Sequence, residues 1–207
     1  MPHDMNKDDE RRNFFDSHAE MWEKKNYHGE TLDKVKNLLQ GLNLPVGGTI
    51  LDVGCGQGVL IPFLRAHAGN DAHIIALDAS APMLQAISAK DPQVTAIHAP
   101  AEKMPLIDAY VDIIICFSAF PHFSNKTAAV REFFRVLKPG GKAYVLHLMG
   151  SEAISRHHDS HHAVRGDYLP CEHGMKSIFG EAGFTNMVLA DCSDYYIFAA
   201  LKAGDSV

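Results

Sequence analysis

The chain has 207 residues, of which 46% are hydrophobic and 21% are charged. These proportions predict one compact globular domain over residues 1–207 and argue against a disordered or fibrous chain. With 19 Lys and Arg against 25 Asp and Glu, the net charge is -6, so we expect no broad basic surface and no nucleic acid partner.

The sequence also argues against a membrane or disulfide-based protein. No segment approaches the roughly 18 consecutive apolar residues that a membrane span needs, and the N-terminus lacks the apolar core of a signal peptide. The four cysteines form no CxxC pair, which is untypical of a zinc ribbon or a disulfide framework. We therefore expect a cytoplasmic location and reduced thiols.

The N-terminal segment 1–29 places aromatic residues among charged ones: Phe14, Phe15, Trp22 and Tyr27. This pattern predicts an amphipathic helix. Such a helix would either fold over a bound cofactor as a lid, where aromatic faces suit a cation, or pack against the rest of the fold in the ordinary way.

Apolar runs rich in β-branched residues predict seven strands, at 49–53, 73–77, 94–97, 111–116, 142–148, 187–190 and 196–201. Between most of them lie segments with helical spacing, and one such helix should begin near Ser124 or Asn125 and end before Pro139. The early strands are apolar throughout, so both faces should be covered. Only 191–195 separates the last two strands, which must therefore pair as an antiparallel hairpin. The sequence predicts an α/β fold with a Rossmann-like, doubly wound, seven-stranded sheet, mostly parallel and ending in that hairpin.

A glycine-rich loop follows the first predicted strand, in the sequence Asp-Val-Gly-Cys-Gly-Gln-Gly at 52–58. Glycines allow the backbone to turn sharply and approach a ligand closely. The next strand ends at Asp78, where a carboxylate can accept hydrogen bonds from both hydroxyls of a ribose. The order strand, glycines, helix, strand and terminal acid predicts a cofactor of the adenosine type.

The glycine spacing argues against a dinucleotide, because the third glycine of that fingerprint would fall at position 59, which is Val59. At these residues the sequence resembles the class I S-adenosylmethionine-dependent methyltransferases, in the small-molecule branch that includes the quinone-biosynthesis C-methyltransferases. The resemblance also covers the run LDAS, the run 101–123 and the run VLKPGGKAYV.

The resemblance implies roles for ten residues. Asp52 would help hold the amino-acid end of S-adenosylmethionine, Asp78 would bind its ribose, and Ser118 would lie near its methionine portion. Ala101 and Glu102 would lie at the adenine edge, where many relatives have an Asp in place of Pro100. The remaining cofactor contacts would come from Gly54, Cys55, Gly56, Gly58 and Ala79, with Cys55 as a packing residue rather than a nucleophile.

Two histidines are candidate catalytic bases, for acceptors that lose a proton. His122 follows the fourth predicted strand and His147 ends the fifth, so both should lie at the edge of the sheet where such folds bind ligands. With an ordinary pKa of about 6.5, either would accept a proton at neutral pH. The alternative is that both only pack or hydrogen-bond the backbone.

The segment 150–171 reads as an insertion over the same edge of the sheet and is rich in histidine. If it is helical, His157, His158, His161 and His162 form two pairs at the spacing i, i+4, which can chelate a divalent metal. Asp159, Asp167, Cys171 and His173 were candidates to complete such a site. An exposed polar helix face is the alternative reading of the four histidines.

The motif order predicts a methyltransferase that transfers a methyl group directly, in line, from S-adenosylmethionine to a small molecule. A second hypothesis is a binding protein that senses S-adenosylmethionine or a metal and has lost catalysis. A third, a nicotinamide oxidoreductase, conflicts with Val59 and with the terminal hairpin.

Overall fold

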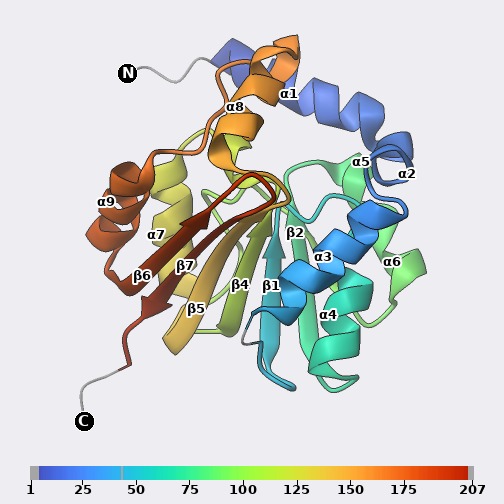
Figure 1. Cartoon of the computed structure of the whole chain (residues 1–207). Coiled ribbons are helices and arrows are strands. Elements are labelled where there is room, and N and C mark those ends of the chain that lie inside the picture. The colour runs from blue at the N-terminus through green and yellow to red at the C-terminus, as the bar shows by residue number, and fades with distance from the viewer. Residues whose placement is uncertain (1–4, 43, 205–207) are drawn as a thin grey trace.

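The computed structural model describes residues 5–42 and 44–204 (Figure 1). Its strands match the seven predicted ones closely: β1 Thr49–Val53, β2 His73–Asp78, β3 Thr95–His98, β4 Val111–Phe117, β5 Leu137–His147, β6 Phe184–Asp191 and β7 Tyr196–Lys202. Its helices are α1 Met5–His18, η1 Ala19–Met21, α2 Trp22–Asn26, α3 Glu30–Gln40, α4 Ile61–Ala68, α5 Ala81–Leu84, α6 Ile87–Lys90, η2 Phe120–His122, α7 Lys126–Val136, α8 Ser151–Asp159, η3 His162–Val164 and α9 Glu172–Ala182.

The strands form one sheet in the order β3-β2-β1-β4-β5-β7-β6. β1 pairs in parallel with β2 on one side and with β4 on the other, and β7 is antiparallel to both β5 and β6. The predicted fold class, including the terminal hairpin, is therefore confirmed. The chain moves outward from β1 in both directions, so the crevice at the carboxyl ends of β1 and β4 is the switch point where such sheets bind ligands.

Helices cover both faces of the sheet (Figure 1). α7 and α9 bury their apolar stripes on one face, with Phe133 and Phe179 fully enclosed. α3 and α4 cover the other face through Val35 and Leu64, which are also fully buried. This two-sided burial explains why the central strands read as continuous apolar runs.

The N-terminal cap of α7 and the start of β5 were both predicted from the sequence. Asn125 caps α7, because its side chain accepts a hydrogen bond from the Ala128 amide at 3.0 Å. The fifth strand begins at Leu137, five residues earlier than predicted, since Leu137 pairs with Val111 and the register then shifts before Lys142. Pro139, which has no amide proton, and Gly140, at φ 82°, lie in the irregular part.

α1, η1 and α2 lie across the carboxyl ends of the central strands (Figure 1). The short helix η3, which follows α8, contacts α1 at the same end. Segments 150 residues apart in sequence therefore meet above the switch point of the sheet. None of the helices in the described part of the chain is long and apolar enough to cross a membrane.

Candidate functional site

The loop after β1 turns the backbone toward the sheet edge through glycines with positive φ. Gly54 has φ 71°, and a Cβ atom there would lie 2.3 Å from the Cβ of Ala119, so a side chain is sterically excluded. Gly56 has φ 52°, but the nearest atom to its hypothetical Cβ is the sulfur of Met83 at 4.0 Å. Gly54 is thus required by packing, whereas Gly56 presents bare backbone to open space.

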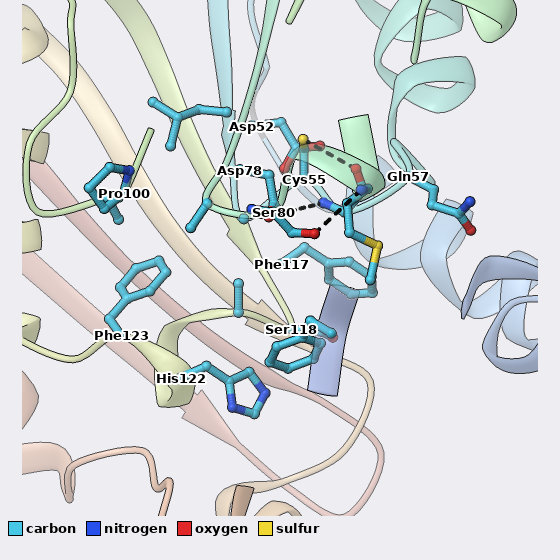
Figure 2. Close-up of a pocket in the computed structure, with 18 of the residues that line it drawn as sticks. Asp52, Cys55, Gln57, Asp78, Ser80, Pro100, Phe117, Ser118, His122 and Phe123 are labelled. Carbon is cyan, nitrogen blue, oxygen red and sulfur yellow. Dashed lines mark hydrogen bonds between the residues drawn. The ribbon is translucent and has the colours of Figure 1, made fainter. Parts of the chain in front are cut away.

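Asp78, at the end of β2, organises this loop. One carboxylate oxygen accepts a 2.8 Å hydrogen bond from the Gly56 amide and the other a 2.8 Å hydrogen bond from the Ser80 amide (Figure 2). Burial raises the pKa of Asp78, and the two amide hydrogen bonds oppose that shift. Each carboxylate oxygen keeps a lone pair, so Asp78 can accept two further hydrogen bonds.

Asp52 is almost completely buried in the same region, with 1% of its surface exposed. Its Oδ2 atom has no hydrogen-bond partner among the described residues. Burial, followed by the nearby charge of Asp78, raises the pKa of Asp52 to about 8. A buried acid with an unpaired oxygen is suited to a donor or cation supplied by a ligand.

These residues open onto a cavity of about 490 Å³ at the carboxyl ends of β1, β2 and β4. Its wall includes ten of the twelve residues that the sequence proposed as cofactor-binding or catalytic: Asp52, Gly54, Cys55, Gly56, Asp78, Ala79, Ala101, Glu102, Ser118 and His122. Gly58 is not on the wall, because it packs behind the loop, where a Cβ would lie 2.4 Å from Ile61 Cδ1.

The N-terminal helices form the opposite wall of this cavity, through Arg11, Phe15, Trp22 and Tyr27. Tyr27 packs on Phe117 at the end of β4, with ring centroids 5.9 Å apart, and burial raises the pKa of Tyr27 to about 12. The Glu23 amide donates a 2.9 Å hydrogen bond to the side chain of Gln57 in the glycine loop. The segment is therefore joined directly to the loop and to the end of β4.

The adenine edge predicted from sequence contains Pro100, Ala101 and Glu102, all on the cavity wall. The carbonyl of Pro100 accepts a hydrogen bond from the Lys103 amide at 3.1 Å. One carboxylate oxygen of Glu102 accepts from the Asn125 amide at 3.1 Å. Among the carboxylates on the cavity wall, Glu102 is the one nearest to Pro100 in the sequence.

His122 lies on the cavity wall beyond Ser118, where Figure 2 shows it away from the Asp78 hydrogen bonds. Its Nδ1 atom is 2.8 Å from Oδ2 of Asp167. Arg11 donates to both oxygens of Asp167, at 2.9 and 2.8 Å. Burial lowers the pKa of His122, although Asp167 opposes the shift.

The prediction that His147 faces the acceptor is wrong, because His147 is not on the cavity wall. It is 5% exposed, its ring lies edge-on to Tyr196 at 6.0 Å, and burial lowers its pKa to about 3. The reason is topological: β5 is one strand farther from β1 than β4, so its end is covered rather than open to the switch point.

The predicted metal site in 150–171 is not supported. α8 ends at Asp159, so His161 and His162 lie beyond the helix. Nδ1 of His158 is 2.7 Å from the Asp167 carbonyl, and Nδ1 of His161 is 2.9 Å from the His157 carbonyl. Within residues 5–42 and 44–204, no group of three or more His, Cys, Asp or Glu side chains is arranged to hold a metal ion.

Sequence reasoning missed the partners that hold His122. Asp167 appeared only as a candidate metal ligand, and Arg11 was not considered. They lie 45 and 111 residues from His122, and no periodicity in the sequence relates such distant positions. Cys55, treated as packing, is buried, and burial raises the pKa of its thiol well above the ordinary value.

Comparisons with known proteins agree with this architecture. Residues 51–145 match the model of a methyltransferase domain family. An uncharacterized methyltransferase of Schizosaccharomyces pombe is 40% identical over 94 residues, which are 45% of this chain and 36% of that protein. The ubiquinone/menaquinone biosynthesis C-methyltransferase UbiE of Vibrio vulnificus is 29% identical over 169 residues, covering 68% of this chain and 65% of that enzyme.

The crystal structure of an S-adenosylmethionine-dependent methyltransferase from Aquifex aeolicus superposes with a TM-score of 0.64 at 21% identity, covering 86% of this chain and 100% of that one. The chain spans less than two thirds of either curated relative named above. The family match over residues 51–145, the related sequences and the sheet order together support the class I S-adenosylmethionine-dependent methyltransferases as the family that this chain resembles.

Proposed function

We propose that the chain is an S-adenosylmethionine-dependent methyltransferase that acts on a small-molecule acceptor by direct, in-line methyl transfer. The observation that carries this proposal is the cradle formed by Asp78, Gly56 and Ser80 at the switch point of the sheet. It joins a fixed carboxylate to bare backbone at the mouth of a cavity of about 490 Å³.

The residues of the cavity fit S-adenosylmethionine, which supplies a methyl group activated by a sulfonium. Asp78 would accept hydrogen bonds from both ribose hydroxyls with its free lone pairs. The unpaired oxygen of Asp52 would accept from the ammonium of the methionine portion. Gly56 would let the backbone approach the cofactor, because nothing lies within 4 Å of its hypothetical Cβ except the sulfur of Met83.

We propose that Glu102 takes the role of the adenine-binding Asp that many relatives have at the position of Pro100. Its carboxylate has one oxygen committed to the Asn125 amide, and a carboxylate accepts about four hydrogen bonds in all. The exocyclic amine of adenine would donate to the other oxygen. Cys55, Ala79 and Ala101 would contribute van der Waals contact on the same wall.

The acceptor would share the cavity with the cofactor and must therefore be small, since about 490 Å³ lies in the lower half of the range for drug-sized ligand sites. It would enter on the side of Ser118 and His122. The chain's contribution to the reaction would be alignment of the two reactants and exclusion of water.

We propose that the segment 1–29 acts as a lid and that 150–171 covers the acceptor side of the same site. Residues 1–4 lie outside the described residues, so this proposal rests on α1, η1, α2 and Tyr27. Phe15 and Trp22 pack together with their ring centroids 5.3 Å apart and line the cavity. The aromatic wall would exclude water and favour a cation. A cytoplasmic location stays a prediction.

The proposal is tested by calorimetry of the full chain with S-adenosylhomocysteine and with NAD⁺. We expect S-adenosylhomocysteine to bind with one site per chain and NAD⁺ not to bind. A crystal structure of the complex should then place ribose at Asp78 and leave vacant volume between the sulfur and His122. Binding of NAD⁺ alone, or of neither ligand, would overturn the proposed function.

A further inference from the structure

We propose that Asp167 is a positioning residue that fixes His122 as a general base, and that the site therefore serves acceptors whose nucleophilic atom carries a removable proton. Such acceptors are hydroxyl, thiol and acidic carbon compounds. This inference rests on the proposed function and adds to it the acceptor class and the residue that orients the base.

The contact with Asp167 determines the tautomer of His122. Burial opposes the negative charge of Asp167, yet the hydrogen bonds from His122 and Arg11 outweigh it and hold the pKa of Asp167 below its ordinary range. An ionised carboxylate only accepts hydrogen bonds, so Nδ1 of His122 must be the donor in the 2.8 Å contact. In the neutral ring the lone pair then belongs to Nε2, the atom that can receive a proton.

His122 lines the cavity, and its ring is held in place by its neighbours. It lies just beyond the end of β4, which is adjacent to β1 in the sheet. Asp167 lies in the segment 150–171, here called the covering segment. The ring is packed by Phe15 at 5.1 Å and by His158 at 4.8 Å between centroids. His158 is itself fixed, because its Nδ1 is bonded to the carbonyl of Asp167. The imidazole is therefore held on several sides.

The titratable and charged groups around His122 include Asp167, His158, Arg11 and His147. Asp167 has a side chain only 3% exposed and also lies 3.3 Å from the Lys7 ammonium. A carboxylate held this firmly would stabilise the imidazolium that forms when Nε2 takes a proton, which is the role of the acid in Ser-His-Asp triads.

Arg11 links the pair of His122 and Asp167 to the N-terminal helix α1. Arg11 binds Asp167 in bidentate fashion, a geometry that fixes a carboxylate more tightly than a single contact. Arg11 also lines the cavity. The base is therefore completely assembled only when α1 lies over the site, so closure of the site and orientation of its base occur together.

The proposed reaction moves one proton and one methyl group. Nε2 of His122 takes the proton from the acceptor, the electron pair left on the acceptor atom forms a bond to the methyl carbon, and the carbon–sulfur pair remains on sulfur as the thioether. The positive charge of the sulfonium is thereby replaced by the charge of the imidazolium beside Asp167. An unprotonated amine would not need this base to the same degree, because a neutral amine nitrogen is nucleophilic enough to attack the methyl carbon before it loses a proton.

The test uses the full chain with S-adenosylhomocysteine bound and ¹⁵N-labelled histidine. Long-range ¹H–¹⁵N correlation spectra report which ring nitrogen carries the proton. We expect His122 at pH 7 to be neutral with the proton on Nδ1, and Asp167→Asn to lose that preference. A wild-type ring with its proton on Nε2, or a charged ring, would overturn the inference without any need for a known acceptor.

A second measurement follows methyl transfer from S-adenosylmethionine to a catechol, an alkyl thiol, a β-diketone and a primary amine. For any of the first three that is methylated, Asp167→Asn should lower kcat at least about tenfold, within the roughly 10²–10⁴-fold that a positioned base contributes. KM for S-adenosylmethionine should change less than about threefold, and Asp167→Glu should recover part of the rate.

The matched control is Asp159→Asn, an exposed acid in the same covering segment. It should change neither the tautomer nor kcat. If Asp167 only ties α1 to the covering segment, Asp167→Asn will lower the melting temperature and leave tautomer and kcat unchanged, which refutes the inference. If wild-type protein fails to bind S-adenosylhomocysteine, the proposed function fails instead, so the two failures are distinguishable.

Discussion

The carboxylate of Asp78 accepts a 2.8 Å hydrogen bond from the amide of Gly56, 22 residues earlier in the chain. This contact holds the glycine loop against the end of β2. A loop held in this way would lose less conformational entropy when a cofactor binds, which would reduce the ordering cost of binding. We propose that Asp78 has two roles: it orients the loop, and its remaining lone pairs would accept hydrogen bonds from a ribose.

Asp78→Ala should weaken S-adenosylhomocysteine binding by about 1.5–3 kcal/mol or more, because hydrogen bonds to a charged group are lost together with the support of the loop. Calorimetry measures the change. Asp112→Asn is the control, since Asp112 accepts from the Thr49 amide at the opposite end of β1 and should affect only stability. Unchanged affinity in Asp78→Ala would remove Asp78 from the ribose site.

Gly56→Ala should reduce cofactor affinity at least about tenfold while the protein still folds. The added methyl group would occupy the space in which we expect the cofactor to contact the backbone at Gly56. The positive φ adds strain of about 1–3 kcal/mol. Gly47→Ala is a matched control, because Gly47 also has a positive φ, 73°, has no atom within 4 Å of its hypothetical Cβ, and is not on the cavity wall. Equal loss of affinity in both variants would show that strain alone is responsible.

The stability of the ligand-free protein should depend on the ionisation of Asp52. Burial raises the pKa of Asp52 to about 8, above the value of about 3.9 expected in the unfolded chain, so folding favours the protonated form. Its contribution to stability is complete below about pH 4 and is lost as the pH rises to about 8. Asp52→Asn should therefore unfold with a free energy about 1–3 kcal/mol higher than wild type at pH 8, with a smaller difference at pH 5.

Urea denaturation at the two pH values measures this effect. Saturation with S-adenosylhomocysteine should reduce the advantage of Asp52→Asn, since a ligand ammonium would compensate the buried carboxylate. If the difference between variant and wild type is the same at pH 5 and pH 8, Asp52 is not the titrating group.

Removal of divalent metal should have no effect on the protein. In the segment 157–162, His158 and His161 hydrogen-bond backbone carbonyls, and His157 stacks on His161 with ring centroids 4.5 Å apart. We expect excess EDTA to leave the melting temperature and the affinity for S-adenosylhomocysteine unchanged within error. A fall in either, reversed by one stoichiometric metal ion, would contradict the arrangement described for this segment.

The order of the strands along the chain and the position of the glycine loop were predictable from the sequence. β-branched runs identify strands because buried parallel strands must be apolar on both faces. The glycine loop was recognisable because bare backbone with positive φ has few alternatives to glycine. The length of the 191–195 connection required the terminal hairpin. Each of these features depends on residues that are near one another in sequence.

The composition of the acceptor side was decided by the tertiary structure. His122 and His147 look equivalent in sequence, since each follows a strand, but only the strand next to β1 opens on the switch point. The spacing of the histidines at 157–162 suggested a metal site. In the structure, packing against α1 instead brings Asp167 to His122 and Arg11 to Asp167. Periodicity reports neighbours within a few residues; a contact across 45 or 156 residues exists only after the sheet has set the distance between segments.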